Sequence, residues 1–142
     1  TTFTPLLGAT SIVDYQGTNQ TIRAADYGTL ELTTGGTRVF ASGTTRIAGD
    51  LVISGTTVDA LTNTILIEFN GTNAQQVGAM AYYQIVFTGG GLKTLSGSAT
   101  AAFTTTINAG ATFRIAASGS LQISNDMLND GVFENQGLLT VP

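Results

Sequence analysis

The sequence predicts an all-β protein, a parallel β-solenoid in which one chain winds through successive layers of short strands. Three observations predict it. Apolar residues alternate with Thr and other polar residues in short runs, and Gly, Ser, Asn or Asp interrupts these runs every six to ten residues. A long stretch of the chain also repeats, and helix signals are poor throughout.

The predicted strands are the segments in which β-branched residues alternate with polar ones between turn residues. They are residues 20–24, 29–33, 37–41, 44–48, 51–54, 63–69, 75–79, 83–87, 92–96, 104–108, 112–116, 121–124, 131–135 and 137–141. Around Asn125 to Asn129 the sequence reads NDMLN, where Asn125 is placed to cap a single helical turn. We interpret that segment as a one-turn insert.

The internal repeat matches residues 13–43 with residues 67–97. The sequence Gly-Thr-Asn at 17–19 falls on the same sequence at 71–73, an offset of 54 residues, and after one inserted residue the offset is 55. The matched positions are apolar residues, turn glycines and one basic residue, which a structural repeat keeps because its units stack on one another. They include Tyr27 with Tyr82, Leu32 with Phe87, Gly35-Gly36 with Gly90-Gly91, and Arg38 with Lys93.

The repeat predicts the dimensions of the coil. Each unit is expected to form two rungs, a rung being one full circuit of the coil with three strands. Rungs about 4.8 Å apart give six or seven rungs for the whole chain, roughly 30 Å in length. Repeat-equivalent residues are expected to lie one above another in register. The alternative is an antiparallel β-sandwich, which shows similar strands at 8–12 residue spacing.

Composition excludes several classes of function. Charged residues make up only 10% of the chain, the net charge is −4, and Lys and Arg together number five. This scarcity of basic residues disfavours nucleic acid and anionic membranes as partners. The chain contains no Cys and no His, which excludes disulfides and metal sites built on those residues.

Residues 1–142 are expected to form one domain, since the length suits a single core. The sequence shows no signal peptide and no apolar run of about 20 residues. We therefore interpret it as a processed or excised segment, or as one subunit, of a larger assembly. Abundant Thr, Gly, Asn and Ser with few charges is typical of proteins displayed outside bacterial cells, so an extracellular or cell-surface location is expected.

Residues 69–97 read FNGTNAQQVGAMAYYQIVFTGGGLKTLSG, and residues 129–141 read NDGVFENQGLLTV. These segments resemble β-helical modules of large secreted and surface proteins of Bacteroidetes-type bacteria, including adhesins. The resemblance covers roughly residues 13–141. It implies an extracellular, repetitive, adhesin-like or filament-forming protein, and it carries no catalytic residue. Where the family has Lys-Thr-Leu, the first repeat of this chain has Arg38-Val39-Phe40, which keeps the pattern of a basic residue followed by apolar ones.

Few residues suggest catalysis or metal binding. Asp14 and Glu68 are equivalent in the repeat and form the candidate carboxylate pair, if the rungs bring them onto one face. Solvated acids that discourage edge-to-edge aggregation are the simpler interpretation. Asp126 and Asp130 lack the spacing of a calcium loop. The glycine runs at 35–36 and 89–91 precede no helix and are interpreted as corners that need positive φ, not as phosphate loops. We predict no enzyme activity, no metal and no cofactor.

Two surface features remain as candidate binding sites. Regular Thr rows on a flat solenoid face would order water, so an ice-binding face is a hypothesis with Thr45, Thr57 and Thr105 as its candidate residues. Aromatic rings at matched repeat positions would form a platform for sugars, although packing at the repeat junctions is the simpler interpretation. The candidate glycan contacts are Tyr15, Tyr27, Tyr82 and Tyr83.

The functional prediction is a non-catalytic, structural or adhesive extracellular protein that associates end to end by β-strand stacking into a fibre or surface filament. Its expected partner is itself or a neighbouring repeat, because an uncovered solenoid end offers unpaired backbone groups and apolar side chains. The alternatives are a carbohydrate-binding adhesin module and an ice-binding solenoid.

Overall fold

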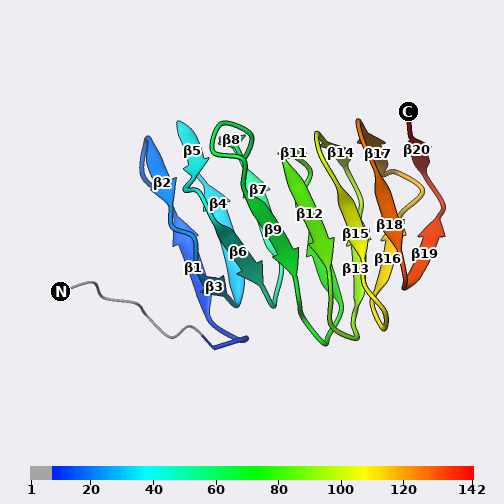
Figure 1. Ribbon diagram of the computed structural model, residues 1–142. Coiled ribbons are helices and arrows are strands. Elements are labelled where there is room, and N and C mark those ends of the chain that lie inside the picture. Colours follow the sequence, from blue (N-terminus) through cyan, green and yellow to red (C-terminus); the bar gives the residue numbers. More distant parts are fainter. Residues whose placement is uncertain (1–7) are drawn as a thin grey trace.

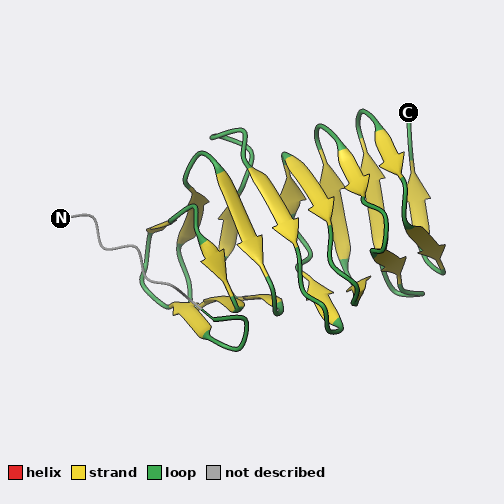
Figure 2. Ribbon diagram, turned by 60° about the horizontal axis from the view of Figure 1, so that its bottom comes forward, coloured by secondary structure: helices red, strands yellow, loops and turns green. Residues whose placement is uncertain are grey.

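The computed structural model describes residues 8–142, which form a parallel β-solenoid of about six rungs, with twenty strands and no helix in that range. The strands advance along the coil axis from the N-terminal to the C-terminal end (Figure 1). Every strand pairing is parallel, and no strands pair as antiparallel hairpins in the described residues (Figure 2). The solenoid prediction is therefore confirmed and the antiparallel sandwich is excluded.

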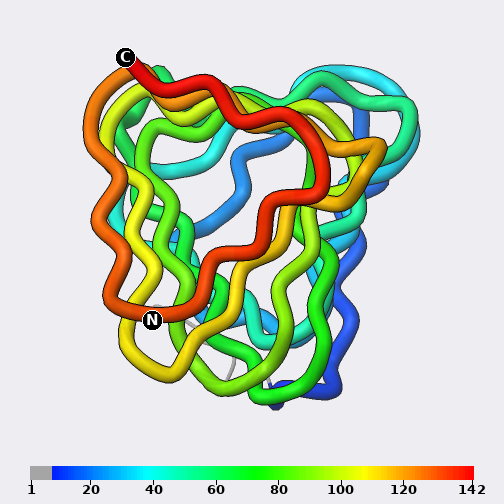
Figure 3. Tube along the Cα trace, turned by 90° about the vertical axis from the view of Figure 1, so that its right-hand side faces the viewer, coloured from blue at the N-terminus to red at the C-terminus, as the bar shows by residue number. Residues whose placement is uncertain are grey.

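Three consecutive strands complete one rung, and the coil has three faces when it is viewed along its axis (Figure 3). The first face consists of β1 (Ile12–Tyr15), β4 (Thr29–Thr33), β7 (Leu51–Ser54), β10 (Gln75–Val77), β13 (Leu92–Leu95), β16 (Thr112–Ile115) and β19 (Val132–Asn135). The second consists of β2 (Gln20–Ile22), β5 (Thr37–Phe40), β8 (Thr57–Asp59), β11 (Ala81–Tyr82), β14 (Ser98–Ala101), β17 (Ser120–Ile123) and β20 (Leu138–Thr140).

The third face is one continuous six-stranded sheet. It consists of β3 (Asp26–Tyr27), β6 (Thr44–Ile47), β9 (Leu66–Phe69), β12 (Gln84–Phe87), β15 (Thr105–Ile107) and β18 (Met127–Asn129). The first and second faces are each interrupted between their third and fourth strands. There β10 lies beside β7 without a regular ladder, and only the bridge from Ala60 to Tyr82 joins the second face.

Alternation sends every second side chain into the coil. Along β4, Leu30 and Leu32 are fully buried while their neighbours are partly exposed, and along β12 Ile85 and Phe87 behave in the same way. The inward aromatic rings stack along the axis, with centroids 5.9 Å apart for Phe69 and Phe87, 4.1 Å for Phe87 and Phe113, and 5.8 Å for Phe113 and Phe133. This stack ties the middle rungs to the C-terminal ones.

The expected stacking of repeat-equivalent residues is wrong. Leu32 lies on the first face between Tyr15 and Ile53, whereas its equivalent Phe87 lies on the third face between Phe69 and Ile107. The repeat equivalent of β1 is β9, which follows it by eight strands. Eight strands are two full rungs of three strands and two more strands, so β9 lies two faces beyond the face of β1. Equivalent residues therefore share local surroundings but lie on different faces, and the second unit is rotated by two thirds of a circuit about the axis.

The segment that was expected to hold a single helical turn is also different. Residues 127–129 form β18, which pairs with β15 in the register Thr105 to Met127. The chain places a strand here because Met127 continues the inward row of Ile67, Ile85 and Thr105 on the third face.

Candidate functional site

The repeat builds the same corner twice, each time around a buried cation. Arg38 is fully buried, and its guanidinium donates hydrogen bonds to the carbonyl oxygens of Tyr15, Thr18, Thr33, Thr34 and Gly35 at 2.6–3.1 Å. Its equivalent Lys93 is also fully buried and donates from Nζ to the carbonyls of Gly71 and Gly91 at 2.8 Å and of Gly89 at 3.3 Å. Desolvation lowers the pKa of Lys93. Both cations hold corners together and are not exposed to any substrate.

A glutamine completes each of these corners. The side-chain oxygen of Gln75 accepts a hydrogen bond from the Gly71 amide at 2.8 Å, and its Nε2 donates to the carbonyls of Ile47 and Gly49 at 2.9 and 2.5 Å. Gln20, the equivalent residue in the first unit, accepts from the Gly17 amide at 2.8 Å. Within residues 8–142, the Nε2 of Gln20 donates no hydrogen bond equivalent to those of Gln75.

The candidate carboxylate pair does not come together. Asp14 lies on the first face, where Thr33 donates to it at 2.7 Å, and Glu68 lies on the third face, where Thr88 donates to it at 2.7 Å. The repeat thus preserves the local bond from a Thr to the acid on the preceding rung, while the rotation separates the two acids. Glu68 also forms an ion pair with Arg46 at 2.9 Å. These acids stabilise the outer surface of the sheet.

The proposed ice-binding face does not form. Thr45 and Thr105 point into the coil, where each is almost fully buried, and their hydroxyls have no hydrogen-bond partner in the described structure. Thr57 is exposed on a different face. Since the three residues share no surface, the choice of Thr45 and Thr105 was wrong. In the pairs at 44–45 and 105–106 one Thr points inward and the other outward, so a Thr pair in the sequence does not identify an outward row.

The four tyrosines separate into two groups. Tyr27 and Tyr82 are buried, and their hydroxyls donate to the carbonyls of Arg23 and Gly78, four residues earlier, at 2.8 and 2.6 Å. Burial raises the pKa of both phenols, and for Tyr27 the hydrogen bond shared with the Tyr15 hydroxyl adds to the effect. These two rings serve as core and corner packing and are not accessible to a glycan. Tyr15 is half-buried at the N-terminal end of the coil.

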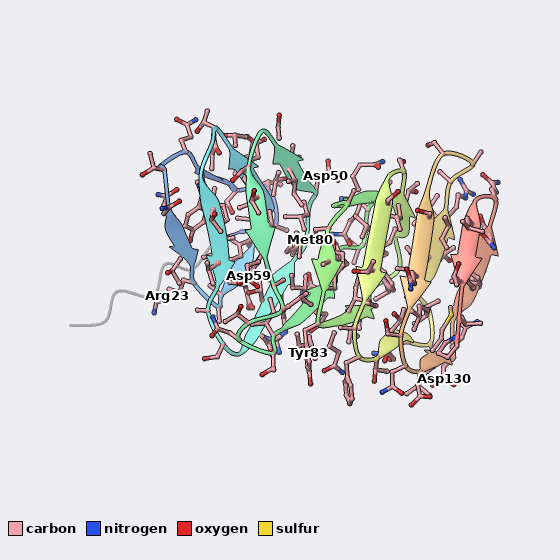
Figure 4. The ribbon with its side chains drawn as sticks, turned by 90° about the horizontal axis from the view of Figure 1, so that it is seen from above. Arg23, Asp50, Asp59, Met80, Tyr83 and Asp130 are labelled. Carbon is pink, nitrogen blue, oxygen red and sulfur yellow. The ribbon has the colours of Figure 1, made fainter. Side chains whose placement is uncertain are left out.

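Tyr83 differs from the other tyrosines, because its side chain projects outward from the ribbon (Figure 4). Its ring stacks on that of Phe103, one rung further, with centroids 5.5 Å apart and planes inclined by 8°. Phe103 is 43% exposed. Phe103 was not predicted from the sequence, because it lies in a corner outside the repeat.

A shallow groove of about 390 Å³ lies on the second face over β11, β14, β17 and β20. Its lining carries no charged side chain and includes Ser98, Thr100, Ser120 and Gln122, and Leu138 borders it. This groove was not predictable from the sequence, since it depends on how small side chains align across four rungs. Among residues 8–142 no three acidic side chains gather into a metal-binding cluster.

Besides the interruption in the middle of the first and second faces, the two ends of the coil leave strands with a partner on one side only. At the C-terminal end β18, β19 and β20 each have one sheet partner, on the preceding rung. Their inward residues Met127, Phe133 and Leu139 are only partly buried, although they pack against the core. At the N-terminal end β1, β2 and β3 likewise have partners only on the following rung within the described residues. Arg23 and Asp130 mark these opposite ends in Figure 4.

Exposed apolar side chains concentrate at the C-terminal end. Leu128, Val132, Leu138 and Val141 are 52–62% exposed.

Comparison with family models, with curated proteins and with solved structures found no match, so the solenoid fold is established here by the structure alone. No helix in the described range is long and apolar enough to span a bilayer.

Proposed function

We propose that this chain is a non-catalytic structural protein that associates end to end by stacking the strand edges of one copy on those of the next. The observation that carries the proposal is the open C-terminal end, where three unpaired strand edges surround Met127, Phe133 and Leu139. An unpaired edge is a template for another strand, and the partly exposed core residues gain burial when a further rung covers them.

An extracellular, adhesin-like or filament-forming role at a bacterial surface fits this assembly. The resemblance of residues 69–97 and 129–141 to modules of secreted Bacteroidetes-type proteins supports it, together with the low content of charged residues. In such a role the solenoid acts through length and repetition, and its partner is a second copy or a neighbouring repeat.

The test is the size of the purified 142-residue chain as a function of concentration. Sedimentation velocity is expected to show a population that grows with concentration, and negative-stain images are expected to show rods longer than one molecule. A species that stays monomeric up to millimolar concentration contradicts the proposal.

Carbohydrate binding is the second candidate function, and the Tyr83–Phe103 pair favours it. The two rings form a partly exposed aromatic surface at one corner of the coil, and an aromatic ring offers an apolar face to a sugar. A glycan array is expected to show a ligand that Tyr83→Ala loses and that Leu61→Ala retains, since Leu61 is 41% exposed but lies in a different loop. Equal binding by both variants contradicts this candidate.

A further inference from the structure

The internal repeat indicates how two copies join, an inference that rests on the end-to-end association proposed above. We propose that a second copy docks on the C-terminal end rotated by two thirds of a circuit, so that its β1, β2 and β3 cover β18, β19 and β20. The occupant of the open end is thus the N-terminal rung of another copy of this chain.

The strand count carries the first step. With twenty strands and three strands per rung, the strand position after β20 lies on the third face, over β18. If β1 of a second copy takes that position, β2 follows over β19 and β3 over β20. The three open strand edges at the C-terminal end then face the three edges at the N-terminal end that have no partner within residues 8–142. In the unrotated arrangement β1 covers β19 and β2 covers β20, and the edge of β18 stays open.

The molecule already contains this junction once. β9 is the repeat equivalent of β1, and it lies on the third face, paired with β6 below it and β12 above it. β9 follows β1 by eight strands, and the docked β1 would follow the β1 of the first copy by twenty strands. With three strands per rung, each number leaves two strands beyond a whole number of rungs, so β9 and the docked β1 are rotated by the same amount relative to β1. The first unit therefore has a counterpart inside the coil whose β9 is seated on the third face as the proposal requires, while its β10 and β11 lie beside the preceding strands of the first and second faces without a regular ladder.

The register follows from the strand pairings of the third face. Ile67 lies in one row with Ile85, Thr105 and Met127, so its equivalent Val13 is placed over Met127. By the same rows Asp14 is placed beside Leu128. Val13 and Met127 both pack inward, and Asp14 and Leu128 both point outward, so the alternation of the two strands agrees.

Gln20 supplies an independent observation. Gln75 places its Nε2 on two carbonyls of an earlier rung, Ile47 and Gly49, which precede β7. On the third face Ile47 belongs to a row of paired residues that ends at Asn129 on the last rung. Gly131 lies two residues after Asn129, just as Gly49 lies two residues after Ile47. The docked Gln20 therefore meets the carbonyls of Asn129 and Gly131 at the open end. The Gly17 amide donates to the side-chain oxygen of Gln20, as the Gly71 amide does to that of Gln75. This leaves the Nε2 of Gln20 to donate to the two carbonyls.

Disulfide trapping tests the register, because the chain contains no cysteine of its own. In the rotated register Cys residues at positions 14 and 128 of two copies lie on adjacent strands about 4.8 Å apart, within the range of a disulfide. In the unrotated register position 14 lies beside position 134 instead. Mild oxidation of the double variant Asp14→Cys, Leu128→Cys is expected to give a ladder of covalent multimers, whereas Asp14→Cys, Glu134→Cys is expected to give none.

A second variant keeps the inference testable without a crosslink. Gln20→Glu retains the acceptor for the Gly17 amide and replaces the donor by an oxygen that faces two carbonyls, so it is expected to weaken association at least tenfold. Thr21→Glu adds the same charge on the exposed side of β2 and is expected to weaken association much less.

The outcomes separate the two proposals. A ladder from the 14 and 134 pair, or association that Gln20→Glu leaves unchanged, overturns the rotated register while end-to-end association stands. The absence of any association by the wild-type chain overturns the proposed function itself.

Discussion

Arg38 and Lys93 are buried charges whose hydrogen bonds go to backbone carbonyls, and neither has a carboxylate partner among its bonds. A three-faced coil must turn its backbone at every corner, and the corner carbonyls point where no strand can pair with them. An unpaired buried carbonyl costs about 1–3 kcal/mol, and a long cation satisfies several at once. This explains why the repeat keeps a basic residue at an inward position.

Lys93→Met is expected to lower the free energy of unfolding by about 1–3 kcal/mol, because it leaves the carbonyls of Gly71 and Gly91 without their donor. Urea denaturation measures the change. Arg46→Met is the matched control, since Arg46 makes only surface ion pairs with Asp26 and Glu68 and should cost less than about 1 kcal/mol. Equal losses in the two variants would show that the corner carbonyls do not need the buried cation.

Tyr82 predicts a dependence of stability on alkaline pH. Burial raises its pKa above the ordinary value of 10.0, so the unfolded chain loses this proton at a pH where the folded chain still holds it. The unfolded state then binds fewer protons, and stability falls as the pH rises above about 10, by up to about 1.4 kcal/mol per pH unit for this group.

Tyr82→Phe is expected to reduce that slope relative to wild type, although it costs about 1 kcal/mol at neutral pH through the lost bond to the Gly78 carbonyl. Ile85→Val is the control, because it also weakens the core but carries no titratable group. Chemical denaturation at pH 8 to 11 gives the two slopes. The prediction is wrong if Tyr82→Phe and Ile85→Val depend on pH in the same way.

At the scale of the strands, alternation of side chains was enough to predict most elements. All fourteen predicted segments overlap a strand, and β4 and β7 have the predicted bounds. The strands that were not predicted are β1, β3, β8, β11, β14 and β18. β3 and β11 have two residues, β8 and β18 have three, and β1 and β14 read Ile-Val-Asp-Tyr and Ser-Ala-Thr-Ala, which show no clear alternation of large apolar and polar residues. In a solenoid such strands form because the adjacent rung supplies a template, which a local pattern does not contain.

The rotation of the repeat was not predictable for a related reason. On the third face, successive rungs place residues 26, 46, 68, 86, 106 and 128 in one row, so the number of residues per rung varies. The loop before β9 adds to this variation: Asp59 accepts bonds from the Leu61 and Thr62 amides and from the Thr62 hydroxyl. Sequence similarity identified which corners are alike, but the face on which each corner lies depends on the sum of all the loop lengths before it.

At the glycine corner of residues 89–91 the sequence likewise did not show which glycine needs which property, and the structure there gives a prediction. Positive φ was expected throughout, yet among these three residues only Gly89 has it, at 71°. Gly91 is required by close approach, because an added Cβ would lie 1.7 Å from the Asn73 carbonyl oxygen, whereas Gly90 faces open space. Gly91→Ala is expected to cost about 3 kcal/mol. Gly90→Ala should be neutral or stabilising by up to about 1 kcal/mol. Thermal unfolding of the two variants decides, and similar melting temperatures would contradict the corner geometry.

At the scale of the whole molecule, the stability of a coil is carried by contacts between neighbouring rungs. The two ends of the described coil are unequal in this respect. At the N-terminal end Ile22 and Tyr27 are already buried, whereas at the C-terminal end Phe133 and Leu139 remain partly exposed. The rungs in the middle share the stacked rings of Phe69, Phe87 and Phe113.

Amide hydrogen exchange in dilute solution should therefore rank the strands along the axis. The slowest exchange is expected in β9, β12 and β13, which have a paired strand or a neighbouring rung on both sides, and the fastest in β18, β19 and β20, which open without disturbing the central stack. When the concentration is raised until copies associate, protection should increase most in β18 to β20 and in β1 to β3, because those strands gain partners across the junction. Uniform exchange along the coil would contradict the independence of the rungs, and protection that rises only on the outer faces would show that the copies meet side by side instead of end to end.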